Sequence, residues 1–194
     1  MTAAPTPYPF TLEIDDPAPQ GRLSVLLRFL YAIPYFFILY FLQFGAAVVG
    51  FVAFWVILFT GKYPTSLRAF ATDVVRWQAR GSAYIFLLTG AYPPFAMGAI
   101  ETYPVRLIGE GELEGRNRLT TFFRYFIIIP HLIALVFVVT AGFFVLLVGW
   151  VVAIFSGTMP RGAHDFLSGQ LRWSTRVVAY SALLTDKYPP FSMK

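Results

Sequence analysis

Two histidines are the residues of this chain whose chemistry best suits a bound ligand. His131 follows Pro130 inside a long apolar run, where an imidazole could bind the iron of a haem or the magnesium of a chlorophyll, or hydrogen-bond a quinone. A histidine one or two turns inside a membrane can equally satisfy a neighbouring backbone group or a headgroup, and we favour this interpretation. His164 stands beside Asp165, but two adjacent residues without further ligands do not make a metal site. His131 is therefore the one candidate ligand residue, and the sequence names no cofactor and predicts no metal.

Arginine and tryptophan side chains recur together at two places. Residues 76–80 read Arg-Trp-Gln-Ala-Arg and residues 172–176 read Arg-Trp-Ser-Thr-Arg, so each tryptophan sits between arginines four apart. An indole at headgroup depth beside guanidinium groups is typical of a membrane interface, although the arginines could also gather into a site for an anionic ligand. Arginines that open the long apolar runs have the same expected role. The predicted headgroup residues are Arg28, Arg76, Trp77, Arg80, Arg124, Arg172, Trp173 and Arg176.

The sequence contains no plausible catalytic constellation. It has no cysteine, which excludes disulfides, thiol catalysis, cysteine-ligated zinc and iron–sulfur clusters. It also lacks a nucleophile-elbow serine and a glycine-rich phosphate loop in a strand-to-helix setting. The formal charge of +5 is modest and lies beside apolar segments, which suits anionic lipid better than nucleic acid. We therefore expect a protein that is not an enzyme and does not bind nucleic acid.

Two long apolar runs organise the chain. Residues 29–59 contain no Asp, Glu, Lys or Arg, and residues 125–155, which lie 96 positions later, are equally free of charge. Each run has a proline at the same place, Pro34 and Pro130. The whole chain is 57% apolar and only 13% charged, whereas about 25% of residues are charged in soluble domains. Runs of this length belong in lipid, so we predict an integral membrane protein of two tandem repeats, residues 1–98 and 99–194.

Each apolar run is too long for one upright crossing of a bilayer. As a single helix it spans roughly 46 Å, against about 30 Å for the hydrocarbon core. Basic residues flank both ends of the first run, and the positive-inside tendency places such flanks in the cytoplasm. We therefore predict a hairpin of two crossings in each repeat, with a single strongly kinked helix as the alternative. The predicted arms are Leu23–Leu42 and Phe44–Phe59 in the first repeat, and Leu119–Val138 and Thr140–Phe155 in the second.

Shorter elements flank each run. Tyr8–Ile14 and Tyr103–Ile108 alternate apolar and polar residues like strands with one buried face, and the two strands could pair. After each run a glycine and a proline end one helix and begin another. In this second helix, from Leu67 to Arg80 and from Phe166 to Arg176, one face is apolar and the other polar, which predicts a helix along the membrane surface. The predicted fold class is all-α integral membrane protein, with two tandem repeats of a short N-terminal strand, a transmembrane helical hairpin and an amphipathic interfacial helix.

The repeated motifs resemble one known family. Residues 103–107 read Tyr-Pro-Val-Arg-Leu, residues 59–64 read Phe-Thr-Gly-Lys-Tyr-Pro, and residues 183–191 read Leu-Leu-Thr-Asp-Lys-Tyr-Pro-Pro-Phe. Together with the Ile-Pro-His and Arg-Trp motifs, this pattern resembles the DUF4389 family, which comprises bacterial membrane proteins of unassigned function. The resemblance covers nearly the whole chain in two tandem copies, and it implies no reaction.

The first copy departs from the second at two places. Tyr35 stands where the second copy has His131, and Gly90-Ala91 stands where the second copy has Asp186-Lys187. Any chemistry that depends on His131 or Asp186 is therefore not duplicated.

The expected function is that of a non-enzymatic scaffold or accessory subunit of a larger complex. Its arginine–tryptophan helices would bind anionic membrane lipid, and small residues such as Gly50 and Gly142 would let helices of other integral membrane subunits approach closely. One alternative is a module that binds lipid, quinone or pigment near His131. A small transporter is a further alternative, although the runs hold few of the polar groups that transport needs. The expected location is the bacterial inner (cytoplasmic) membrane, as a multi-pass protein whose charged flanks and termini are cytoplasmic.

Overall fold

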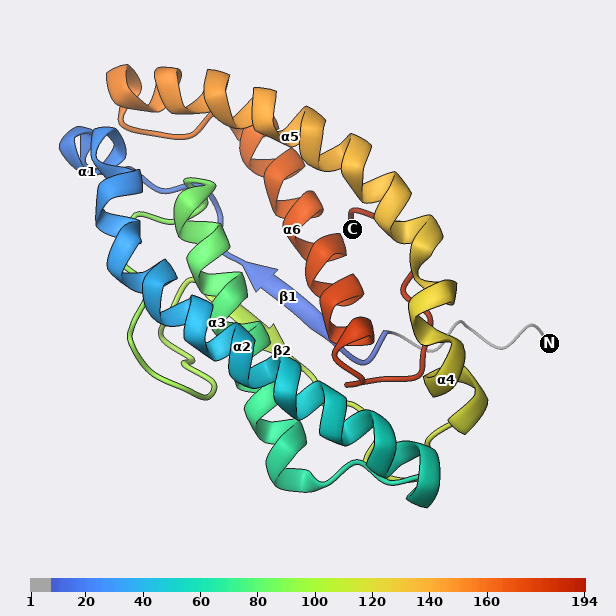
Figure 1. Cartoon of the computed structure of the whole chain (residues 1–194). Helices are drawn as coiled ribbons and strands as arrows, with labels where there is room; N and C mark the ends of the chain where they lie inside the picture. Colours follow the sequence, from blue (N-terminus) through green and yellow to red (C-terminus); the bar gives the residue numbers. More distant parts are fainter. Residues whose placement is uncertain (1–7) are drawn as a thin grey trace.

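The computed structural model of the chain describes residues 8–194 (Figure 1), so the predicted cytoplasmic N-terminus lies outside the described residues. The elements in chain order are β1 (Thr11–Ile14), α1 (Arg22–Leu26), α2 (Arg28–Thr60), α3 (Thr65–Ile85), β2 (Val105–Ile108), α4 (Arg118–Ile127), α5 (Ile129–Ser156) and α6 (Arg161–Ser181). The protein is mostly helical and contains two repeats. Two helical stretches, Arg28–Thr60 and Arg118–Ser156, are long and apolar enough to cross a membrane.

The predicted helical hairpins are wrong, because α2 and α5 continue through the expected turns without a break. Neither turn region contains a proline or a polar cluster that would end a helix. In α2, Gln43 lies at the expected turn, and its Nε2 donates to Gln78 Oε1 of α3 at 2.7 Å. The actual interruptions fall inside the first predicted arm of each repeat, at Leu27 between α1 and α2 and at Ile128 between α4 and α5. The arms that do not form as hairpins are Leu23–Leu42 with Phe44–Phe59, and Leu119–Val138 with Thr140–Phe155.

The predicted pairing of the two short strands is confirmed. β1 and β2 form an antiparallel ribbon in which Leu12 lies opposite Leu107 and Glu13 lies opposite Arg106. Leu12 and Leu107 are buried on the inner side of the ribbon, whereas Glu13 is exposed on its outer side. The alternation that the sequence shows therefore separates a side facing the core from a side facing away from it.

The two copies exchange segments around an approximate two-fold axis. β1 packs on α6 of the other copy and β2 on α3, while α1 packs on α5 and α4 on α2. Backbone hydrogen bonds repeat this exchange. The N–H of Gln20 donates to the carbonyl of Gly157 at 2.7 Å, and the N–H of Arg116 donates to the carbonyl of Gly61 at 3.1 Å. Since both members of the two pairs differ by 96 positions, the end of α2 is tied to the start of α4 as the end of α5 is tied to the start of α1.

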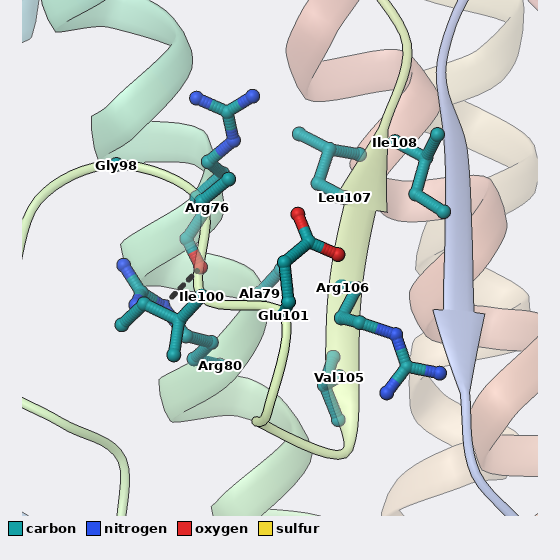
Figure 2. Close-up of a pocket in the computed structure, with 11 residues that line it drawn as sticks. Arg76, Ala79, Arg80, Gly98, Ile100, Glu101, Val105, Arg106, Leu107 and Ile108 are labelled. Carbon is teal, nitrogen blue, oxygen red and sulfur yellow. Dashed lines mark hydrogen bonds between the residues drawn. The ribbon is translucent and has the colours of Figure 1, made fainter.

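Helices α3 and α6 form the middle of the molecule, and α2 and α5 flank them (Figure 1). On α3, Phe70, Trp77 and Gly81 face α2. Arg76 and Ala79 lie on the other side of α3 and line a hollow with β2. In Figure 2 the two strands accordingly lie in front of α6 and α5. The ribbon and the long helices thus cover opposite sides of the α3–α6 pair.

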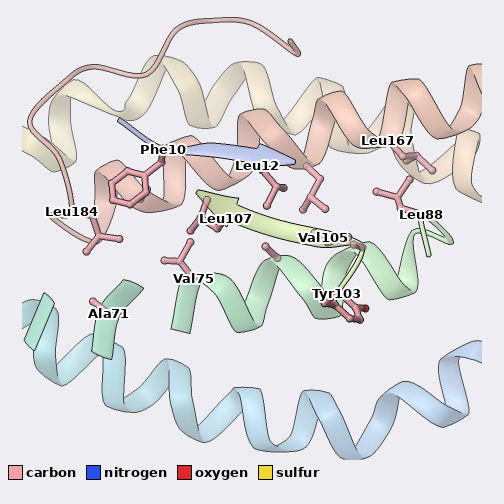
Figure 3. Close-up of a cluster of buried hydrophobic side chains, with 14 of the residues drawn as sticks. Phe10, Leu12, Ala71, Val75, Leu88, Tyr103, Val105, Leu107, Leu167 and Leu184 are labelled. Carbon is pink, nitrogen blue, oxygen red and sulfur yellow. The ribbon is translucent and has the colours of Figure 1, made fainter. Parts of the chain in front are cut away.

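The apolar core lies between α3, α6 and the inner side of the ribbon (Figure 3). Its side chains include Phe10, Leu12, Val75, Val105 and Leu107. Both central helices are buried along most of their length, which corrects the expectation that each has a polar side open to water. Their polar sides are covered because the ribbon and the chain that follows each helix pack against them.

Close packing of α2 on α3 predicts a specific sensitivity at Gly81. A Cβ at this position would lie 2.5 Å from Cε1 of Tyr35, whose ring is stacked on Trp77. We expect Gly81→Ala to destabilise the protein by about 1–3 kcal/mol, since the two helices must separate. Gly50→Ala is the matched control, because nothing lies within 4 Å of its Cβ. Thermal unfolding in detergent measures both, and equal melting temperatures would contradict the packing described.

Candidate functional site: buried arginines and aromatic clips

Arg124 is fully buried and holds the loop after α6 in place. Its Nη1 donates to the carbonyls of Tyr180 and Thr185, the second at 2.7 Å. Its guanidinium also lies 4.3 Å from the centre of the Tyr180 ring, a favourable cation–π position. Within the same loop Leu183 has a φ of 64°, a left-handed conformation that leucine rarely adopts. The arginine therefore stabilises a strained turn that reverses the chain.

Arg28 is the equivalent residue of the first copy and has the same role. It is fully buried, donates to the carbonyl of Thr89 at 3.1 Å, and lies 4.0 Å from the centre of the Tyr84 ring. The loop it holds contains Leu87 with a φ of 58°. The prediction that Arg28 and Arg124 contact headgroups is corrected, since side chains without exposed surface cannot reach lipid.

The charge of Arg124 is balanced by Asp186. Arg124 Nη2 donates to Asp186 Oδ1, and Arg116 Nη2 donates to the same oxygen at 2.7 Å. Arg116 also donates from Nη2 to the carbonyl of Leu183 at 2.7 Å. Both guanidinium groups are fully buried. Two arginines and one aspartate therefore give this cluster a single net positive charge.

The first copy reaches the same net charge with neutral residues. Gln20 takes the position of Arg116, and Gly90 takes the position of Asp186. Gln20 donates to the carbonyl of Leu87 at 2.7 Å, as Arg116 does to Leu183, and accepts from Arg28 Nη2. A Cβ on Gly90 would lie 3.2 Å from Cγ of Gln20, so the glutamine fills the space of the missing carboxylate. The two substitutions compensate each other in charge and in volume.

His131 is fully buried, and both of its ring nitrogens have protein partners. Nδ1 accepts from Trp173 Nε1 at 3.1 Å, so the ring proton is on Nε2, which lies 3.0 Å from the carbonyl of Pro189 and donates to it. The ring also stacks on Phe191, with 3.8 Å between centres. No nitrogen is left for the metal of a haem or chlorophyll. The geometry makes His131 a support for residues 188–191, which we name the second aromatic clip.

Tyr35 supports the first aromatic clip, residues 92–95, in the same way. Its hydroxyl donates to the carbonyl of Trp77 at 2.8 Å, and its ring stacks on Trp77 with 5.0 Å between centres. Phe95 of the clip lies 5.7 Å from the Tyr35 ring. Tyr35 and His131 thus make different hydrogen bonds, but the ring of each packs against the phenylalanine of its clip.

Arg80 and Arg176 hold the chain that follows each clip. Arg80 Nη2 donates to the carbonyl of Ala96 at 2.8 Å, and Arg176 donates to the carbonyls of Ser192 and Lys194, the second at 2.6 Å. Burial lowers the pKa of both guanidinium groups from their ordinary value. They stay charged at neutral pH because arginine titrates far above it.

Of the eight predicted headgroup residues, only Arg76 and Arg172 keep part of their side chains at the surface. Arg76 pairs with Asp73 at 2.8 Å, and Arg172 donates to the carbonyl of Leu12 at 3.1 Å. Four exposed basic residues lie instead at the ends of the long helices. They are Arg22, Lys62, Arg118 and Arg161, and Lys194 is exposed as well.

Two further polar places lie within residues 8–194, a hollow beside β2 and the surroundings of His164. The hollow between α3 and β2 is lined by Arg76, Arg80, Glu101 and Arg106 and has a volume of about 30 Å³, room for about one water (Figure 2). His164 is buried with Nδ1 3.8 Å from Asp165 Oδ1, and burial lowers its pKa. Within residues 8–194, no three His, Cys, Asp or Glu side chains gather to hold a metal.

The compensated clusters predict a rescue between Arg116 and Asp186. We expect Asp186→Asn to destabilise the protein by about 3 kcal/mol, because it leaves two buried guanidinium groups without a counter-charge. The double variant R116Q/D186G reproduces Gln20 and Gly90 of the first copy, and we expect it to recover most of the loss. Asp165→Asn, with a side chain that is 78% exposed, is the neutral control. Thermal unfolding of the four proteins measures the coupling, and a double variant no more stable than Asp186→Asn would contradict it.

A structural role for His131 predicts that tyrosine can replace it. His131→Leu leaves the Trp173 N–H and the Pro189 carbonyl without partners, and we expect faster hydrogen exchange in residues 188–194. His131→Tyr copies the first repeat and should keep these residues protected. If the tyrosine variant exchanges as fast as the leucine variant, the support described here is not what orders the second clip.

The repeats seen in the fold coincide with a sequence family. The profile described as "Domain of unknown function (DUF4389)" matches residues 22–97 and again residues 118–193. The first match runs from α1 to just past the first clip, and the second runs from α4 past the second clip. The chain matches none of the curated proteins and none of the solved structures compared with it. It belongs to the DUF4389 family, of which it carries two tandem copies.

Proposed function

We propose that the protein is a non-enzymatic scaffold or accessory subunit of a larger complex in the bacterial inner membrane. The observation that carries the proposal is the outer side of α2 and α5, which exposes large apolar side chains along its whole length. Tyr40, Phe44 and Phe59 of α2 are 71–73% exposed, and Phe137 and Phe155 of α5 are 71% and 74% exposed. Surfaces of this kind need lipid or protein to cover them.

The use of polar groups inside the fold supports a scaffold over an active site. The buried arginines bind carbonyl groups of the chain itself, and His131 binds Trp173 and the second clip. Preorganised groups of this kind fix a shape, whereas catalysis needs polar groups aimed at an open site.

A groove beside α2 supports contact with other membrane subunits. It measures about 590 Å³, lies between α2, α4 and α6, and is floored by Ala46, Ala47 and Gly50. Nothing lies within 4 Å of a Cβ on Gly50, so the backbone of α2 is open to a close neighbour. Small residues at an exposed helix surface are where another membrane helix packs best. Gly142 and Gly149, by contrast, are already covered by Gln170 and Met159 of this chain.

The scaffold proposal predicts a partner that depends on this groove. Protein purified gently from native membranes should migrate with other membrane proteins, and Gly50→Leu, which fills the groove, should lose them. Val48→Leu, on the outer side of α2 where Val48 is 51% exposed, is the matched control and should keep them. A wild-type protein that purifies without any other subunit would contradict the proposal.

A second candidate function is binding of a polar lipid or quinone, favoured by Gln170. Its Oε1 is buried without a hydrogen-bond partner among the described residues, and the side chain borders a cavity of about 170 Å³ between α3 and α6. An unpaired buried amide is costly, and a water or a ligand hydroxyl would satisfy it. A stoichiometric quinone or lipid in the extract of wild-type protein, lost in Gln170→Leu, would favour this candidate over the scaffold.

A further inference from the structure

The exposed apolar side chains of the long helices and the charged side chains of the ribbon lie on opposite sides of the molecule. The large exposed apolar residues come from α1, α2, α4, α5 and the stretches around the two clips, apart from Ile108. The outer side of the ribbon is polar, with side-chain exposures of 48% for Glu13 and 52% for Asp15, both bound to Arg106. Since the ribbon and the long helices cover opposite sides of α3 and α6, the charges face away from the apolar surface.

The approximate symmetry places the ribbon midway along the long helices. The axis exchanges the end of α2, near Lys62, with the end of α5, near Arg161. Leu12 and Leu107, at equivalent places in the two strand motifs, face each other across the ribbon, so the axis passes through its centre. If α2 and α5 stood upright in a bilayer, Glu13, Asp15 and Arg106 would lie at its middle, where ionised side chains are strongly disfavoured.

The length of α2 and the basic residues at its ends also argue against an upright crossing of the bilayer. Its 33 residues span roughly 50 Å, well beyond the hydrocarbon core of about 30 Å. Exposed basic residues lie at both ends of the molecule, Arg22 and Arg161 at one and Lys62 and Arg118 at the other. Basic residues at both ends favour a position of both ends on the same side of the membrane. A helix that lies along the membrane surface has both ends on one side and needs no hairpin turn.

We propose that the protein occupies a single lipid leaflet, with α2 and α5 parallel to the membrane plane and the two-fold axis along the membrane normal. The inference rests on the membrane location in the proposed function and specifies how the chain sits there. The outer sides of α1, α2, α4 and α5 face the acyl chains. The ribbon faces water. Arg22, Arg118 and Arg161 at the helix ends meet the phosphates of anionic lipids around the rim, whereas Lys62 at the end of α2 is bound to Glu114 at 2.9 Å.

Single cysteines test this orientation directly, because the native chain has none. Cysteines replacing Glu13, Lys62 and Arg161 are treated in whole cells and in inverted vesicles with a membrane-impermeant maleimide. In the proposed orientation all three react from the same side. In a spanning orientation Lys62→Cys and Arg161→Cys react from opposite sides, and Glu13→Cys reacts from neither.

Spin labels on α2 give an independent readout of depth. Leu30, Phe44 and Phe59 lie at the start, middle and end of its outer side and are 59–71% exposed. After reconstitution into vesicles containing phosphatidylglycerol, the three labels should show equal accessibility to oxygen and low accessibility to a polar nickel complex. In a helix that crosses the bilayer, the ratio of oxygen accessibility to nickel accessibility would be several-fold higher for the Phe44 label than for the other two. That result would overturn the proposal. Each variant is checked against the cysteine-free parent for melting temperature.

The outcomes separate this inference from the proposed function. Protein that is washed from membranes by alkaline carbonate, with all labels open to the nickel complex, would overturn both. Membrane-bound protein with Lys62 and Arg161 on opposite sides would overturn only the orientation. Labels on α2 that are shielded from lipid and from water alike would show that a protein partner, and not a leaflet, covers this surface.

Discussion

The protein covers only one side of each long helix, and the rest of the structure follows from this constraint. Along α2, Tyr35, Ala53 and Ile57 are buried while the opposite side exposes aromatic rings. A helix that is apolar all round needs an apolar environment on the side its own chain leaves open. In the proposed arrangement a lipid leaflet supplies that environment. The buried arginines then bind carbonyl groups inside the fold, the ribbon turns its charged side chains to water, and exposed basic residues lie at the helix ends.

The duplication explains how so small a chain maintains buried charges. Each copy places one arginine under a reversing loop, and the other copy's strand and first helix close over the structure. Asp186 with Arg116 and Gly90 with Gln20 are two solutions to the same problem of keeping a single net charge next to carbonyl groups. The copies therefore differ at these positions in compensating pairs, whereas Tyr35 and His131 differ as single residues.

Much of the fold could be predicted from the sequence, and the failures have identifiable causes. The repeat, the strand pair and the helical segments were predictable from periodicity and spacing. The hairpins were predicted because length and basic flanks exclude an upright crossing, yet the same two facts fit a helix lying in the plane. Arg28 and Arg124 were assigned to headgroups because an arginine beside an apolar run resembles a boundary residue. Nothing local reveals that a loop 61 positions later folds over it. One signal was available: Gln20 and Gly90 differ together from Arg116 and Asp186, which indicates contact within each pair.

The orientation of the helices as a whole is the central claim, and oriented circular dichroism of the protein in aligned bilayers tests it most directly. The account predicts the spectrum of helices lying in the membrane plane, in which the shorter-wavelength of the two negative helical bands is strong. Loss of that band on alignment, the sign of helices standing along the membrane normal, would contradict the account.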